Sequence, residues 1–134
     1  MKSVIRLAHI PPSTNGLYRN VNGRGRVKTE RYKVWLQAVS HDMKKYHNHK
    51  WTEPVYLTIA IGKLRGNADV SNCIKAVEDL LVTYGVIPGD SIKWVRGVNV
   101  YLAQEPFEGV EIAITPAEQA GNPLLPPLGV DQAA

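Results

Sequence analysis

The chain has 134 residues, of which 44% are hydrophobic and 21% are charged. This composition is typical of a single globular domain, and the length is too short for two separate hydrophobic cores. The 16 Lys and Arg residues against 12 Asp and Glu give a net charge of +4, which favours an acidic partner such as nucleic acid. The single cysteine excludes an internal disulfide, and no apolar run reaches the length of a membrane span. We therefore expect a reduced, cytoplasmic location without membrane contact.

The first segments predict a strand followed by a hairpin. Apolar and β-branched residues favour a strand from Ser3 to Ile10. The Pro11-Pro12 pair ends this strand, because proline donates no hydrogen bond to a sheet. From Leu17 to Lys28, strand-like residues flank an Asn22-Gly23 dipeptide, which is the strongest local signal of a β-hairpin.

This predicted hairpin is strongly basic. It carries one aromatic ring and four cations, at Tyr18, Arg19, Arg24, Arg26 and Lys28. Cations suit contacts with the phosphate backbone, and an aromatic ring can stack on an unpaired base. We therefore interpret the hairpin as a DNA-binding arm. The alternative is a strand edge whose charges only keep the protein soluble.

The middle of the chain predicts a helix and then a strand. Thr29 is placed to cap a helix that extends to about Tyr46, with apolar residues along one side. From Pro54 to Ile61, four aliphatic residues alternate cleanly with Tyr56, Thr58 and Ala60, which predicts a strand. The loop that follows carries Lys63 and Arg65, and such cations would position a negatively charged DNA backbone.

A second amphipathic helix is expected next. Asp69 stands at its N-cap, apolar residues recur at helical spacing from Val70 to Tyr84, and Gly85 fits the residue just beyond its end. A turn then leads to Asp90. Two carboxylates thus lie at the two ends of one helical unit, with Lys75 one to two turns in from the first.

The last part of the chain predicts two strands and a tail. The strands, Lys93 to Ala103 and Val110 to Thr115, are expected to pair as an antiparallel hairpin. We expect residues 1–115 to form one α+β domain, in which helices pack on a sheet. Residues 116–134 show no periodicity and are interrupted repeatedly by Pro and Gly, which predicts a mobile tail.

The two carboxylates and the lysine suit one kind of chemistry. Hydrolysis of a phosphodiester needs hard oxygen ligands for Mg²⁺, a way to make hydroxide from water, and positive charge near the phosphate. Asp69 and Asp90 are suited to the first task and Lys75 to the others. The same residues also have an ordinary structural interpretation, as a helix cap, an exposed lysine and a turn residue.

These residues belong to a longer pattern. It reads D-x-x-N-x-x-K-x-x-x-D-x-L and then G-V-I-x-x-D, with P-P-S-x-N near the N-terminus. The pattern resembles the RusA family of Holliday junction resolvases, small Mg²⁺-dependent endonucleases of bacteria and their phages. The resemblance covers roughly residues 10–115. It implies a mixed, largely antiparallel sheet, a homodimer, and an endodeoxyribonuclease that resolves Holliday junctions and other branched DNA by paired nicks.

The resemblance also implies roles for individual residues. Asp69, Lys75 and Asp90 would be catalytic, with Asp69 and Asp90 as ligands of Mg²⁺. Together with the basic segments, it gives a set of expected DNA contacts at Asn15, Tyr18, Arg19, Arg24, Arg26, Lys28, Lys63, Arg65 and Asn72.

The chain departs from the family at Ser71, which stands in the place of a second aspartate. A hydroxyl is neutral and binds Mg²⁺ more weakly than a carboxylate does. Either Ser71 holds a metal-bound water, or Glu78 or Asp79 fills the gap, or activity is lowered. The alternative function is therefore a non-catalytic DNA-junction binding protein that retains the fold, and a third is a basic protein-interaction domain.

Overall fold

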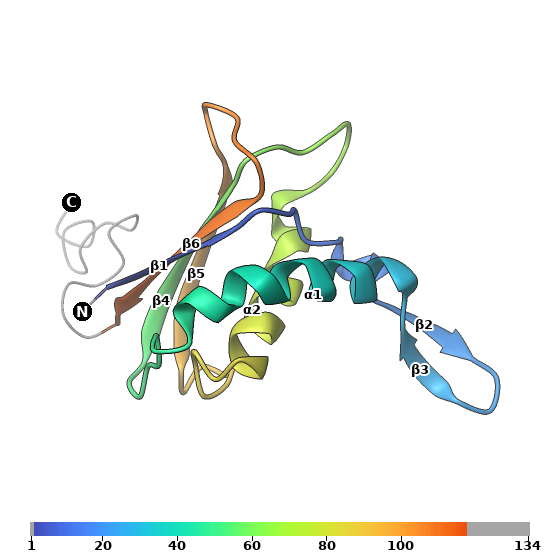
Figure 1. Cartoon of the computed structure of the whole chain (residues 1–134), viewed down its shortest axis with the longest axis horizontal. Coiled ribbons are helices and arrows are strands. Elements are labelled where there is room, and N and C mark those ends of the chain that lie inside the picture. Colours follow the sequence, from blue (N-terminus) through green and yellow to red (C-terminus); the bar gives the residue numbers. More distant parts are fainter. Residues whose placement is uncertain (1, 118–134) are drawn as a thin grey trace, which may run out of the picture.

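A mixed sheet forms the centre of the computed structural model, which describes residues 2–117 (Figure 1). Its four strands lie in the order β1 (Ser3–Leu7), β6 (Val110–Pro116), β4 (Val55–Ile61) and β5 (Val95–Leu102). The β1–β6 and β6–β4 pairs are antiparallel, and the β4–β5 pair is parallel. The sequence-based prediction of an α+β fold with a mixed, largely antiparallel sheet is confirmed at this level.

Two helices cover one face of this sheet (Figure 1). Helix α1 (Glu30–Met43) buries four side chains at helical spacing, and helix α2 (Ile74–Thr83) buries four more. These side chains join one core cluster with the inward-facing residues of the strands, among them Leu57 and Ile112, which are fully buried. None of the helices formed by residues 2–117 is long and apolar enough to cross a membrane.

The predicted hairpin forms a separate two-stranded sheet of β2 (Tyr18–Val21) and β3 (Gly25–Lys28). It projects away from the main sheet as an arm (Figure 1). The Thr29 side chain joins the arm to α1, because its Oγ1 accepts from the Tyr32 amide at 3.2 Å and donates to the Gly16 carbonyl at 2.6 Å. The predicted helix cap at Thr29 is therefore confirmed.

The prediction that the last two strands pair with each other is wrong. Strand β6 lies between β1 and β4, whereas β5 pairs only with β4 at the sheet edge. The burial of the two strands explains this order. Strand β6 alternates fully between its two faces and suits a central position, while Tyr101 and Leu102 of β5 are about half exposed, as is tolerated at an edge.

The start of the second helix also differs from the prediction. Residues Val70–Cys73 form a 3-10 turn, η3, and the α-helix begins only at Ile74. Asp69 has extended backbone angles at the start of this turn, but its side chain makes no capping hydrogen bond. Its expected role as a helix cap is wrong.

Two other boundaries move by a few residues. Strand β1 ends at Leu7, because the next amide, that of Ala8, donates to Asp42 Oδ2 at 2.9 Å instead of to the sheet. At the other end β6 includes Pro116, and the Ala117 amide still donates to Pro54. The predicted tail from 116 onward thus begins in ordered structure, and its residues 118–134 lie outside the described residues.

The loop of residues 103–109 approaches β1 so closely at Gly109 that even an added methyl group is expected to destabilise the protein strongly. Gly109 has a φ of +83°, and an added Cβ would lie 1.7 Å from the Leu7 carbonyl oxygen. We expect Gly109→Ala to lower the free energy of unfolding by about 3 kcal/mol or more, through strain and overlap together. Urea denaturation measures this. Gly23→Ala is the matched control, since Gly23 has a φ of +76° but open space around it, so a similar loss there would contradict the overlap.

Candidate active site

Lys75, Asp79 and Asp90 form an ion-pair cluster on the exposed side of α2. Lys75 Nζ lies 3.1 Å from Asp79 Oδ1 and 3.3 Å from Asp90 Oδ2. The helix supplies the first pair, because residues four apart lie on the same face. The turn after the helix supplies the second. Gly85 takes a φ of +71° there, and the Val86 amide bonds back to Leu81, so the chain reverses toward Asp90.

The two carboxylates hold Lys75 in its charged form. Its pKa is raised, chiefly by the hydrogen bond to Asp79, against an opposing effect of burial and with further help from Asp90. All three side chains remain partly open to solvent, with exposed fractions of 48% for Lys75, 26% for Asp79 and 41% for Asp90. The cluster is thus accessible to a substrate from outside.

A third carboxylate, that of Glu78, lies beside this cluster. The pKa of Glu78 is raised, first by burial and then by the negative charge of Asp90. Within residues 2–117, however, no three side chains among His, Cys, Asp and Glu converge closely enough to hold a metal ion by themselves. The position most suited to a cation lies between Asp79 and Asp90, where the ammonium group of Lys75 now sits.

Asp69 lies in a different hollow, at the start of the η3 turn. This hollow has a volume of about 210 Å³ and is lined by Pro11, Ser13, Leu64, Asn67, Ala68, Asp69, Asn72 and Cys73. The Thr14 hydroxyl donates to the Asn72 carbonyl at 3.0 Å. The structure therefore brings the P-P-S-x-N loop against the D-x-x-N turn, although the two are far apart in sequence. Ser71 and Asp69 are both exposed.

No ion pair joins Asp69 to Lys75 in the described part of the chain, and Lys75 instead pairs with Asp79 and Asp90. Of the three residues expected to be catalytic, two are thus in contact and the third is not. Asp79, which belongs to the quoted pattern and is one expected substitute for the missing aspartate, is the carboxylate that the structure places with them.

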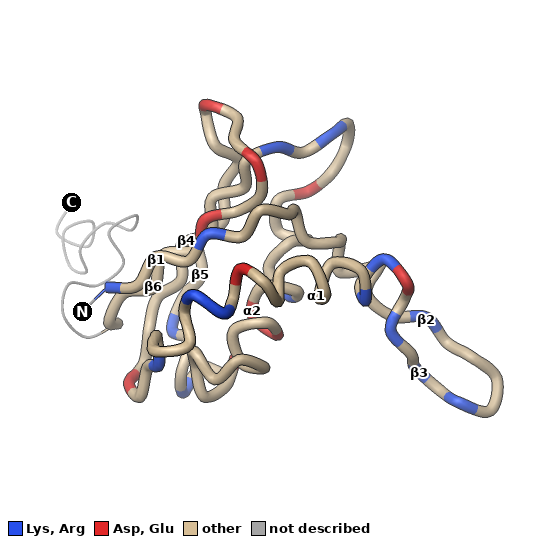
Figure 2. The backbone as a smooth tube through the Cα atoms, in the orientation of Figure 1, with Lys and Arg blue, Asp and Glu red and all other residues tan. Residues whose placement is uncertain are grey.

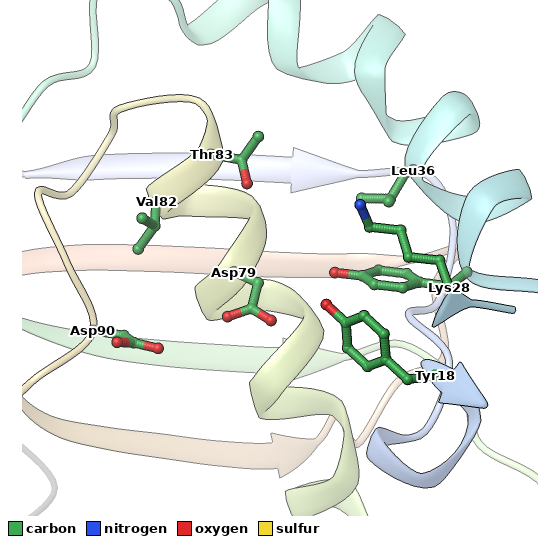
Figure 3. Close-up of a pocket in the computed structure, with 8 residues that line it drawn as sticks. Tyr18, Lys28, Leu36, Asp79, Val82, Thr83 and Asp90 are labelled. Atoms are coloured by element: carbon green, nitrogen blue, oxygen red, sulfur yellow. The ribbon is translucent and has the colours of Figure 1, made fainter. Parts of the chain in front are cut away.

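A cleft separates the arm from α2 and opens beside the cluster (Figure 3). Its volume is about 460 Å³, and its lining consists of Tyr18, Lys28, Tyr32, Leu36, Asp79, Val82, Thr83 and Asp90. In Figure 3 the hydroxyl of Tyr18 points toward the carboxylate of Asp79. The foot of the arm, at Tyr18 and Lys28, therefore adjoins the ion-pair cluster.

Two contacts hold the ring of Tyr18. The Arg26 guanidinium lies 4.4 Å from its centroid, and the Tyr32 ring meets it edge-on with centroids 5.7 Å apart. Tyr32 is itself buried, and burial is the main cause that raises its pKa to about 12, followed by Tyr18 and Asp79. Tyr32 thus stays neutral and acts only as a hydrogen-bonding group and an aromatic wall.

The remaining predicted DNA contacts fall into two groups. Figure 2 shows Lys and Arg along the arm, where Arg19, Arg24 and Arg26 are exposed. A second basic loop lies apart from the arm and contains Lys63 and Arg65; Lys63 is paired with Glu108 at 2.7 Å. The arm therefore adjoins the cluster, whereas the positive charge of Lys63 is already partly offset. Asn15 is exposed in the short turn before the arm.

The sequence does not indicate four of the residues that line the cleft, namely Tyr32, Leu36, Val82 and Thr83. The sequence pattern assigns Tyr32 only to the core of the first helix, yet its position three residues after the Thr29 cap places it at the foot of the arm. The spacing of Tyr32 from the Thr29 cap could therefore have indicated that Tyr32 lies near the arm. No sequence signal places Thr83 in the cleft, because its position there depends on how α2 and the arm pack together.

No family model matches this chain.

Proposed function

We propose that the protein is a Mg²⁺-dependent endodeoxyribonuclease that nicks branched DNA, as the resemblance to the RusA family implies. The observation that carries this proposal is the position of Lys75, whose ammonium group lies between two carboxylates at the end of a basic arm. A cation site beside a phosphate-binding surface is what hydrolysis of a phosphodiester requires.

The residues at this position fit a magnesium ion. Mg²⁺ is commonly held by one or two carboxylates, with waters and substrate phosphate oxygens completing its shell. Asp79 Oδ1 and Asp90 Oδ2 lie 3.1 Å and 3.3 Å from the ammonium nitrogen of Lys75, so both carboxylates face one position that a positive charge already occupies. When bound, the metal would supply positive charge at the scissile phosphate and lower the pKa of a coordinated water.

The chain's own residues divide the remaining work. Asp79 and Asp90 would hold the metal, whereas Asp69, a ligand implied by the resemblance, lines a different hollow. Displaced from between the carboxylates, Lys75 would turn to the phosphate and offset the charge that develops there. The arm would hold the DNA backbone through Arg24 and Arg26.

We also propose that the protein acts as a homodimer, following the same resemblance. A four-way junction contains two symmetry-related strands to be nicked, and a two-fold dimer presents two sites related in the same way. The resemblance and the symmetry of the substrate support this part of the proposal.

The test is cleavage of a synthetic four-way junction. We expect paired nicks with Mg²⁺, and binding without nicking when Ca²⁺ replaces it, because Ca²⁺ fills an oxygen site without the same chemistry. A linear duplex of the same sequences is the control substrate. Equal cleavage of the duplex would remove the preference for branched DNA, and absence of nicking under all metal conditions would remove the activity.

A second candidate is a junction-binding protein without cleavage. It is favoured by Ser71, which is neutral where the family that the chain resembles has an aspartate. It is also favoured by Asp69, which lines a different hollow from the one beside the Lys75 cluster. The same assay separates the two functions. Tight binding of the junction in Ca²⁺ without nicking in Mg²⁺ or Mn²⁺ would establish the second candidate.

The arm has its own prediction. Replacing Arg24 and Arg26 together by Ala is expected to weaken DNA binding uniformly across sequences and to reduce the slope of log affinity against log salt by about one unit for each phosphate that is no longer bound. Binding at several salt concentrations measures this slope. Arg96→Ala, which removes an exposed cation of β5 outside the arm, is the control, and an unchanged slope in the double variant would exclude the arm from the interface.

A further inference from the structure

We propose that the cleft between the arm and α2 is a binding site for one unpaired nucleobase, and that it selects DNA with an unstacked base next to the cleaved phosphate. This inference rests on the proposed nuclease function, because it places the base beside the same cluster. It goes further in assigning a site for the base itself, with named walls.

The first support is the size and lining of the cleft. Its volume of about 460 Å³ lies in the range of roughly 300–1,000 Å³ that is usual for small-ligand sites. The rings of Tyr18 and Tyr32 and the side chains of Leu36 and Val82 supply aromatic and aliphatic surface, and Thr83 supplies a hydroxyl. A cleft that combines aromatic and aliphatic walls with hydroxyl and charged groups suits a flat heterocycle with polar edges.

The second support is the way in which the Tyr18 ring is held. Arg26 lies on this ring and Tyr32 meets it edge-on, so the ring has little freedom to lose when a base stacks on it. Tyr32 is in turn fixed by its burial and by the bond from its amide to Thr29. A stacking surface fixed before binding costs less entropy than one ordered by the ligand.

The third support is charge. Lys28 lines the cleft on the side of the arm, while Asp79 and Asp90 line it on the side of α2, as Figure 3 shows. A nucleotide with its base between these walls can place its phosphate toward the cation position and the preceding backbone along the arm. A base inside an intact duplex is stacked and paired and cannot enter, so the cleft would discriminate between DNA structures rather than between paired sequences.

The test compares two DNA probes in Ca²⁺, where binding is read without cleavage. Each is a duplex with one central unpaired nucleotide, which carries thymine in one probe and is abasic in the other. The wild-type protein is expected to bind the abasic probe about five- to hundredfold more weakly, the range for loss of one stacked base. Equal binding of the two probes by the wild type would overturn the inference.

Four variants show where in the protein the difference in affinity between the two probes arises. Tyr18→Ala removes one wall and Thr83→Trp fills the cleft from an exposed helix end, so each variant is expected to bind both probes about equally. Tyr18→Phe keeps the ring and should retain most of the difference. Val34→Trp places the same bulky side chain at a position on α1 that is 63% exposed and outside this cleft, and should leave the difference at its wild-type value.

The outcomes separate this inference from the nuclease proposal. The wild type could nick a four-way junction with Mg²⁺ and yet bind the thymine and abasic probes with equal affinity. In that case the cleft is not a base site, and the nuclease proposal stands. A base effect that survives in both Tyr18→Ala and Thr83→Trp likewise places the base elsewhere. If the wild type neither binds these probes nor nicks the junction, both proposals fail.

Discussion

Asp90→Asn is expected to reduce Mg²⁺-dependent nicking of a four-way junction by about a hundredfold or more, while the protein stays folded and still binds the junction. The change keeps the size of the side chain but removes the negative charge of one of the two carboxylates that approach Lys75. A hundredfold loss corresponds to about 2.7 kcal/mol of transition-state stabilisation, which is modest for loss of a charged metal ligand. Binding should not weaken, because the change removes a charge that repels DNA.

Glu105→Gln is the matched control for this variant. Glu105 is exposed in the loop between β5 and β6, outside the cluster, and the same exchange of a carboxylate for an amide there should leave nicking unchanged. Single-turnover rates and junction affinities for the two variants decide the matter. An Asp90→Asn protein that nicks within a few-fold of the wild-type rate would show that this carboxylate holds no metal.

Lys75→Ala has the second large expected effect, and it carries a signature that a structural role would not produce. Loss of one positioned cation from an active site typically costs about 10²–10³ in rate. The same change removes the ammonium group that competes with a metal for Asp79 and Asp90. Nicking should therefore fall while the Mg²⁺ concentration needed for half-maximal nicking also falls.

Lys33→Ala serves as the control, since Lys33 is an exposed lysine of α1 that pairs with Glu30 at 3.6 Å. It should change neither the rate nor the metal requirement. A Lys75→Ala variant that loses activity but needs more Mg²⁺ would show that Lys75 supports the metal site instead of occupying it.

Local patterns predicted most of the elements. The alternation in β4, the cap at Thr29 and the Asn-Gly turn of the arm all act over a few residues, and the structure confirms each of them. The sheet order could not be obtained in this way. Whether β6 pairs with β5 or lies between β1 and β4 depends on contacts between segments about 100 residues apart, and both arrangements fit the same alternation.

At the candidate site, too, local patterns predict contacts between residues close in sequence but not contacts between distant ones. The pair of Lys75 with Asp79 follows from helical spacing alone, because residues four apart lie on the same face of a helix. The approach of Asp90 depends on the turn at Gly85 and could be expected only from the resemblance. The separate position of Asp69 arises from the 3-10 geometry of η3, which a regular helical pattern in the sequence did not reveal.

The metal requirement of three proteins tests most directly whether the cation position between Asp79 and Asp90 is the metal site. The quantity measured is the Mg²⁺ concentration for half-maximal nicking of a four-way junction by wild type, Asp79→Asn and Ser71→Asp. A site between Asp79 and Asp90 predicts at least about a tenfold higher requirement in Asp79→Asn, and no gain in Ser71→Asp, where an added carboxylate would lie beside Asp69. An unchanged requirement in Asp79→Asn, together with a lower one in Ser71→Asp, would contradict it and place the metal at the start of η3.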